Sequence, residues 1–289
     1  ERSVRKGRDT HTLGILLQQG GRAFYRNLGS ALRQEANRHV EAPVELKLEY
    51  LDDLSPDNVA AQIIKLSNTC DAVALVAAQH PKVADAIDTV TGNGVPVVAL
   101  IAPLTAHTNV GFVGLDSYMV GRTAAWAFDS MVRNPGEIGL LIGNHRYRNQ
   151  EMNESGFRSY FREHNTAFTI LEPVATYESA AVAREMVEGL FRDHPNLCGL
   201  FVSGGGITGA LSALREVKKR PNFIAVGYEL FDATRDALID GTLKLVISHP
   251  LNRFAREAVE TMIRAKKDGA NAGAQLVALG FEIYTSENV

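Results

Sequence analysis

The chain has 289 residues, of which 45% are hydrophobic and 22% are charged, and its formal net charge is −3. That length allows one large domain or two small ones, and the composition is ordinary for a folded globular chain. The small negative charge argues against a protein that grips nucleic acid over its whole surface. No apolar run is long enough to span a bilayer, and no signal peptide is recognisable, although a mature exported protein would lack one too.

Two further features of composition bear on function. Basic residues gather at the extreme N-terminus, at Arg2, Arg5, Lys6 and Arg8, where a solvated tail and the remnant of a linker to a DNA-binding element are equally good explanations. The two cysteines, Cys70 and Cys198, each begin an apolar strand-like run. No His or second Cys is spaced to complete a disulfide or a metal site, so we expect buried thiols, no metal and no cofactor.

The first hundred residues alternate short apolar runs with amphipathic segments. Residues 13–17 form a continuous apolar run, typical of a strand buried on both faces of a parallel sheet, and apolar residues at helical spacing follow from Phe24. Further strands are expected at 44–51, 73–77 and 95–100, and further helices at 55–67 and 81–90. This βαβαβαβ order predicts a parallel sheet with helices on its faces.

Residues 110–126 end this first series and begin a second one. Their start is β-prone, and Asp116 or Ser117 can cap the helix that follows. The order then repeats, with strands expected at 137–142, 168–174, 197–202 and 223–226, and helices at 151–164, 179–193 and 207–217. Because the repeat is one of architecture and not of residue identity, it suggests two similar lobes without proving a duplication.

The remaining tail is too short for a third lobe, so its elements must join the two sheets. It offers helices at 232–240 and 252–267, a strand at 243–248 and a last apolar segment at 276–284. We expect the chain to cross between lobes near Glu229 and again near His249. The prediction is an α/β protein with two Rossmann-like parallel-sheet lobes joined by several crossovers. The N-terminal lobe would comprise 1–108 and 231–249, and the C-terminal lobe 109–230 and 250–289.

One motif suggests a different class of protein. Gly204-Gly-Gly-Ile-Thr-Gly209 fits G-x-G-x-x-G after an expected strand, and Glu229 stands twenty residues on, as in a dinucleotide fingerprint. However, it lies in the seventh βα unit and not the first. Glycines that let the chain turn tightly near a ligand explain it more simply, although a phosphate on the helix N-terminus stays open. No catalytic motif is present, so we expect no enzyme.

Several segments carry a family resemblance through their order and spacing: 12–17 with Phe24-Tyr25, 113–116 with Gly121, Gly156-Phe157, 225–229 and 246–250. Together they resemble the effector-binding core of the lactose-repressor family of bacterial transcription regulators. That core has the type I periplasmic-binding-protein-like fold, which it shares with periplasmic sugar-binding proteins. The N-terminus resembles the end of the family's linker, which implies a helix-turn-helix headpiece outside this sequence.

The sequence departs from its relatives at four places that matter for a ligand. Ile101 stands where sugar-binding relatives often carry Asp, and Asn153 where the family has Arg. The triplet 204–206 replaces the usual Asn-Asp, and Glu229 replaces an Asp. The pocket is therefore remodelled, and the ligand cannot be copied from a well-known member.

Ligands of open parallel sheets bind beyond the carboxyl ends of the strands, and two facing lobes would place those ends along one cleft. A sugar needs planar polar groups for its hydroxyls and an apolar face for its C–H side. The candidate ligand-binding residues are Gln18, Phe24, Tyr25, Gln79, Arg146, Arg148, Asn153, Ser203, Glu229 and His249.

Several of these candidates also have a purely structural explanation. Phe24 could simply begin the apolar stripe of its helix, and Arg146 and Arg148 could be solvated loop charges. Glu229 could form a structural ion pair, and His249 could be an ordinary hinge histidine.

The resemblance implies a cytoplasmic repressor-type regulator with no membrane partner. It would be a homodimer that binds a sugar, sugar alcohol or sugar phosphate between its lobes and thereby changes operator DNA binding by the headpiece. The alternative is a monomeric periplasmic receptor that delivers a sugar to a transporter. The basic N-terminal segment favours the regulator.

Overall fold

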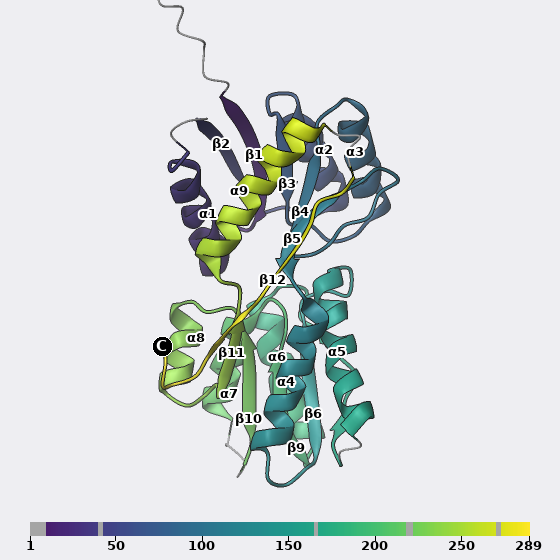
Figure 1. Cartoon of the computed structure of the whole chain (residues 1–289). Helices are drawn as coiled ribbons and strands as arrows, with labels where there is room; N and C mark the ends of the chain where they lie inside the picture. The colour runs from purple at the N-terminus through teal and green to yellow at the C-terminus, as the bar shows by residue number, and fades with distance from the viewer. Residues whose placement is uncertain (1–9, 40–42, 165–166, 218–221, 270–272) are drawn as a thin grey trace, which may run out of the picture. The chain divides into compact units, whose positions relative to one another are not determined.

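The computed structural model of the chain describes residues 10–39, 43–164, 167–217, 222–269 and 273–289 (Figure 1). The chain divides into two compact units. Unit 1 comprises Glu1–Gly114 and Leu251–Leu279, and unit 2 comprises Leu115–Pro250 and Gly280–Val289. The basic residues at positions 2, 5, 6 and 8 lie outside the described residues.

Within the described residues, the sheet of unit 1 has six strands in the order β12-β5-β4-β3-β1-β2. The strands are β1 (His11–Gln18), β2 (Val44–Leu51), β3 (Ala72–Leu75), β4 (Val97–Leu100), β5 (Gly111–Leu115) and β12 (Leu276–Leu279). Strands β1 to β5 pair in parallel. Every residue of β3 and β4 is buried, as expected for strands covered by helices on both faces.

Helices cover the two faces of this sheet (Figure 1). They are α1 (Ala23–Ala36), α2 (Pro56–Ser67), α3 (Pro81–Gly92) and α9 (Leu251–Asp268). α1 packs beside α9, and α2 packs beside α3 over alternate strand residues such as Val73 and Val97. α2 begins as the sequence predicts, because Ser55 accepts a hydrogen bond from the backbone N–H of Asn58 and a proline follows it.

Unit 2 repeats this plan. Within the described residues its strands run in the order β13-β11-β10-β9-β6-β7, and β8 also pairs with β6. They are β6 (Glu137–Ile142), β7 (Thr169–Ile170), β8 (Val174–Ala175), β9 (Leu197–Val202), β10 (Ile224–Tyr228), β11 (Leu245–Ser248) and β13 (Glu282–Tyr284). All pairs are parallel except β11 with β13. The predicted α/β fold of two parallel-sheet lobes is therefore confirmed.

The helices of unit 2 are α4 (Ser117–Met131), α5 (Arg148–His164), α6 (Ala180–Asp193), α7 (Ile207–Glu216) and α8 (Asp232–Ile239). α4 packs on α5, and α6 packs on α7. A Cβ on Gly121 would collide with the carbonyl oxygen of Asn153, and one on Gly156 with that of Tyr118. Glycine at these two positions therefore lets α4 and α5 approach closely.

The tail joins the two units in a different way from the one the sequence predicts. Residues 231–249, expected in the N-terminal lobe, form α8 and β11 of unit 2, because β11 pairs in parallel with β10. α9, expected in the C-terminal lobe, belongs to unit 1. There the Nζ of Lys266 lies 3.0 Å from Oδ2 of Asp71, which also accepts a hydrogen bond from the N–H of Thr12 at 2.7 Å.

The chain passes between units after Gly114, Pro250 and Leu279. The sequence predicts crossings near 108, Glu229 and His249, so it finds the one beside Pro250 and misplaces the others. The single apolar segment expected at 276–284 is two short strands, β12 in unit 1 and β13 in unit 2. Gly280 and Phe281 separate them. Among the described residues, no helix combines the length and apolar character that crossing a membrane requires.

Candidate functional site

The carboxyl ends of the parallel strands of unit 2 bring several predicted residues to one edge of its sheet. Ser203 directly follows β9, Glu229 follows β10, and His249 follows β11. All three are buried. Buried polar groups at this edge are the arrangement from which open α/β sheets build ligand sites.

Glu229 and His249 form a hydrogen-bonded pair. Oε1 of Glu229 lies 2.5 Å from Nδ1 of His249, and Oε2 accepts from the His249 N–H and the Ser248 Oγ, each at 3.2 Å. The Ser248 Oγ in turn accepts from the N–H of Leu230 at 3.0 Å. Both carboxylate oxygens of Glu229 therefore tie the end of β10 to the end of β11. This geometry fits the structural explanation of Glu229, and its contact with a ligand stays a prediction.

Two amide side chains near the start of α5, Gln150 and Asn153, form hydrogen bonds with the residues that follow β6 and β9. Oε1 of Gln150 accepts from the N–H of Gly143 at 2.6 Å and of Asn144 at 3.2 Å, while its Nε2 donates to Oε1 of Glu178 at 3.3 Å. Asn153 lies within 3.2 Å of the Ser203 hydroxyl. Asn153 is fully buried, so the structure brings it together with Ser203 as the sequence predicts.

The two predicted arginines follow β6, Arg146 in the loop and Arg148 as the first residue of α5. Arg146 is exposed and Arg148 is half-buried at the start of α5. The backbone N–H of Arg146 donates to Oδ1 of Asn144 at 2.9 Å, which shapes the loop. An exposed guanidinium agrees with the alternative of a solvated loop charge, and ligand contact by either arginine stays a prediction.

The carboxyl edge of the unit 1 sheet carries the other candidates. Gln18 ends β1, and its Nε2 donates to the carbonyl of Val76 at 3.3 Å while its Oε1 accepts from the Tyr25 hydroxyl at 3.2 Å. Tyr25 meets Phe24 edge-on, with ring centroids 5.2 Å apart, and both rings are buried. Gln18, Phe24 and Tyr25 thus lie together, as predicted.

Gln79 is fully engaged with the backbone of one residue. Its Nε2 donates to the carbonyl of Thr105, and its Oε1 accepts from the Thr105 N–H, both at 2.9 Å. The amide therefore joins the loop after β3 to the loop after β4 within unit 1. Its predicted contact with a ligand is untested.

Sequence reasoning missed a strained turn at the unit 2 edge. Tyr177 and Glu178 both have positive φ, at 51° and 61°, and Tyr177 is 71% exposed. Non-glycine residues in this region are uncommon, and such strain gathers at functional sites. Thr176 fixes the turn by donating from Oγ1 to the carbonyl of Gly205 at 2.7 Å. No sequence pattern signals a positive φ at Tyr or Glu.

The glycine triplet 204–206 has a steric explanation. A Cβ on Gly204 would collide with the backbone N of Gly143, and Gly206 has a φ of +85° at the position before α7. Both sites require glycine. The triplet therefore packs the ends of β6 and β9 together, which supports the simpler interpretation of the motif over a dinucleotide fingerprint.

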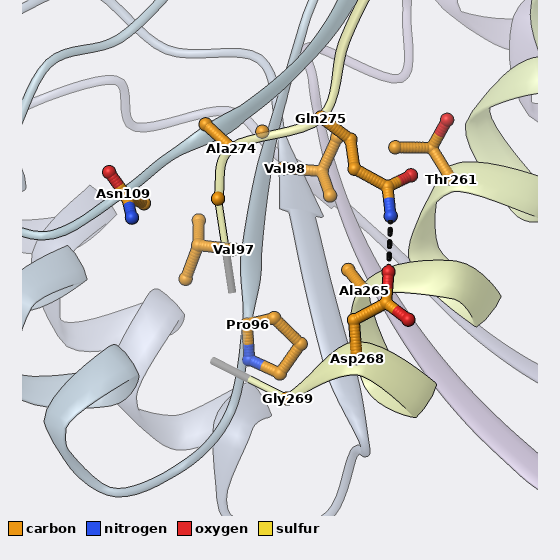
Figure 2. A pocket seen from close by; sticks show the side chains of 12 residues that line it. Pro96, Val97, Val98, Asn109, Thr261, Ala265, Asp268, Gly269, Ala274 and Gln275 are labelled. Carbon is orange, nitrogen blue, oxygen red and sulfur yellow. Dashed lines mark hydrogen bonds between the residues drawn. The ribbon is translucent and has the colours of Figure 1, made fainter. Parts of the chain in front are cut away.

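Figure 2 shows a small pocket elsewhere in unit 1. Its volume is about 30 Å³, room for about one water molecule. Pro96 and Asn109, which precede β4 and β5, contribute to its wall, as do Asp268 and Gln275, joined by a 2.9 Å hydrogen bond. The pocket therefore lies at the amino ends of the strands, away from the edge where the candidate residues gather.

Cys70 and Cys198 are free thiols. Cys70 is buried and Cys198 is half-buried, and burial raises the pKa of each thiol above its usual value. Both therefore stay protonated near neutral pH. Among the described residues, no three His, Cys, Asp or Glu side chains gather as metal ligands would.

Comparison with known proteins gives the family. The family model that describes the periplasmic binding protein domain matches residues 14–270 of this chain. The xylose/arabinose-binding protein XylF of Sulfolobus acidocaldarius is 26% identical over 144 residues, which are 48% of this chain and 35% of that protein. The D-apiose import binding protein of Paraburkholderia graminis is 20% identical over 173 residues, 60% of this chain and 55% of that protein.

A solved structure extends the likeness to the whole fold. The chain superposes on GanP, a glucose-galactose binding protein from Geobacillus stearothermophilus, with a TM-score of 0.86 and 14% identity, covering 97% of this chain and 99% of that one. At that identity the likeness shows the fold alone. The chain spans about a third to just over half of the curated relatives it matches.

These findings overturn the predicted regulator. The matching family and the curated relatives are binding proteins, and neither relative is a transcription regulator. The lactose-repressor assignment, the repressor function, the operator DNA partner and the cytoplasmic location were therefore wrong. The error has a physical source, because both groups of proteins use one core fold, and the segments that carried the resemblance belong to that shared core. The predicted homodimer has no support in these comparisons. The chain belongs to the periplasmic binding protein domain family.

Proposed function

We propose that this chain is the sugar-binding receptor of a transporter and that it works outside the cytoplasm. This was the alternative to the regulator in the sequence analysis. Its family supports the proposal, as do its curated relatives, a xylose/arabinose-binding protein and a D-apiose import binding protein. We further propose that it is a binding protein and not an enzyme.

One structural observation carries the proposal. The sheets of both units end in buried polar side chains at their carboxyl edges, Gln18 in unit 1 and Ser203, Glu229 and His249 in unit 2. Each of these side chains is hydrogen-bonded within its own unit, which holds its polar atoms in fixed positions at the edge. A polyhydroxyl ligand supplies both donors and acceptors to such an edge.

Aromatic side chains at the same edges suit the apolar C–H face of a sugar. Phe24 and Tyr25 lie next to Gln18 in unit 1, and Tyr177 presents an exposed ring after β8 in unit 2. The C–H side of a pyranose or furanose packs on such rings. We propose an aldopentose or aldohexose as the ligand, held by these rings and by the polar residues predicted from the sequence.

A thermal-shift screen tests the proposal. The protein is heated with D-xylose, L-arabinose, D-apiose, D-glucose and D-galactose in turn, with mannitol as a polyol control. A ligand that binds only the folded chain at 100 times its Kd stabilises it by about 2.7 kcal/mol, so at least one sugar should raise the Tm by several degrees. Equal melting with every sugar at millimolar concentration would contradict the proposal.

A further inference from the structure

The start of α5 holds three buried amide side chains, which we call the amide cluster: Asn149, Gln150 and Asn153. Gln150 uses its oxygen for two backbone N–H groups and its nitrogen for Glu178. Asn153 is satisfied when its Nδ2 donates to the carbonyls of Ser117 at 2.8 Å and Asn149 at 3.2 Å and its Oδ1 accepts from the Ser203 hydroxyl at 3.2 Å. Two of the three amides are therefore fully used within unit 2.

Asn149 differs from the other two. The residue is only 5% exposed and its Oδ1 is buried, yet this oxygen has no hydrogen-bond partner among the described residues. A buried acceptor without a donor destabilises the folded state, and native proteins keep few such atoms. An asparagine in this state needs a reason other than stability.

The position of Asn149 suggests that reason. It stands four residues before Asn153, so the two side chains lie one above the other on the same face of α5. Asn153 reaches Ser203 at the end of β9. Asn149 lies one turn nearer the helix N-terminus, and α5 follows the carboxyl end of β6 after a short loop. It is therefore on the side of the sheet where ligands of open α/β sheets bind.

We propose that Asn149 is a specificity-determining residue whose Oδ1 accepts a hydrogen bond from a hydroxyl of the bound sugar. This inference rests on the proposed function and narrows the ligand. An acceptor oxygen needs a donor, which a neutral sugar hydroxyl supplies and which an ionised carboxylate or phosphate dianion does not. At this point of the site the ligand therefore presents a hydroxyl, and a sugar acid or sugar phosphate cannot place its anionic group there.

Three variants test the inference: Asn149→Ala, Asn149→Asp and the control Met152→Ala, an exposed position on the same helix. Titration calorimetry measures the Kd for D-xylose, L-arabinose, D-glucose and D-galactose, and urea unfolding measures the free protein. Asn149→Ala should raise the Kd of the tightest sugar at least about tenfold, with an unchanged or higher urea midpoint. Asn149→Asp keeps an acceptor oxygen at the same place and should retain the Kd within about threefold. The control should change neither quantity.

Two outcomes would overturn the inference. An unchanged Kd in Asn149→Ala would show that the ligand does not use this oxygen. A lower urea midpoint of free Asn149→Ala would show that the oxygen supports the fold through a buried water. If the wild-type protein binds none of these four sugars and not D-apiose either, the proposed function fails, and the inference that rests on it fails with it. An unchanged Kd of Asn149→Ala for a sugar that the wild-type protein binds overturns the inference alone and leaves the proposed function standing.

Discussion

The carboxyl edges of the two sheets share a backbone plan and differ in chemistry. The residue directly after β4 in unit 1, Ile101, has a φ of 66°, and the residue directly after β10 in unit 2, Glu229, has a φ of 70°. A β-branched residue in this left-handed region is a strained outlier. Ile101 brings no polar group to its edge, whereas Glu229 binds two neighbours through its carboxylate. The shared fold thus dictates the backbone at this position, and the side chain is free to set the chemistry.

The two edges are also stabilised in different ways. In unit 1, the amides of Gln18 and Gln79 donate to backbone carbonyls, and Gln18 also accepts from the Tyr25 hydroxyl. In unit 2, Gln150 likewise binds backbone groups, but two pairs of buried side chains also bind each other, Glu229 with His249 and Asn153 with Ser203. Removing one member of a side-chain pair leaves the other buried without its partner, so single substitutions should harm the edge of unit 2 more than that of unit 1.

The largest effect is expected for Glu229→Ala. It removes the partner of a buried histidine and two further acceptor contacts, so the free energy of unfolding should fall by about 3–5 kcal/mol in urea unfolding at neutral pH. The sugar-induced rise in Tm should also disappear. A loss below about 1 kcal/mol would mean that the pair contributes no more than an exposed one.

Gln79→Ala is the matched change in unit 1. It removes two hydrogen bonds to the backbone of Thr105 at a half-buried position. The same unfolding experiment should show a loss of about 1–2 kcal/mol. If this variant loses as much stability as Glu229→Ala, the contrast between the two edges is not real.

Tyr177→Asn separates stability from binding at the strained turn of unit 2. The exposed ring contributes little burial, and asparagine tolerates a positive φ better than tyrosine, so the free protein should gain about 0.5–1 kcal/mol. The sugar should bind more weakly, because the ring no longer covers its apolar face. Ile239→Asn, another exposed apolar position, serves as the control. Unchanged affinity in Tyr177→Asn would remove this residue from the site.

The smallest effect concerns the contact that holds α9 in unit 1. Partial burial disfavours the Asp71 carboxylate, but hydrogen bonds from Thr12 and Lys266 outweigh it and lower the pKa of Asp71 below its usual 3.8. Because the pKa of Asp71 is lower in the folded state than in the unfolded state, its carboxylate stabilises the fold at a pH above the unfolded-state pKa. This stabilisation is lost as the pH falls through the folded-state pKa. Asp71→Asn should therefore lose less stability than wild type between about pH 4 and pH 2, by under about 1 kcal/mol for so exposed a pair. If the free energies of unfolding of wild type and Asp71→Asn fell by the same amount over this pH range, this prediction would be wrong.

Most of the fold could be predicted because buried parallel strands are continuous apolar runs. The bounds of 44–51, 137–142 and 197–202 agree with β2, β6 and β9. The expected strand at 168–174 is only two short pieces, β7 and β8, because it lies at the edge of the sheet. The elements of the tail are predicted in the wrong units, because no local pattern tells which sheet a strand joins: β11 pairs with its neighbour β10 in unit 2.

The site could be predicted only in part. Strand-end logic found Gln18, Ser203, Glu229 and His249, which the structure places at the carboxyl edges. It did not predict the two residues proposed here in addition: Asn149, whose buried oxygen is visible only after α5 is packed, and Tyr177, whose φ cannot be read from the residue type. The function was misassigned because the core fold is common to regulators and receptors, and a fold alone does not decide between them.

Titration calorimetry of the wild-type chain with D-xylose, L-arabinose, D-apiose, D-glucose and D-galactose tests the central claim most directly. A receptor with one site at the ends of its strands predicts saturable binding of at least one of these sugars, with one sugar per chain and a Kd in the micromolar range or below, about −8 kcal/mol or stronger. The absence of binding heat for every sugar at millimolar concentration, from a protein that unfolds cooperatively, would contradict the account.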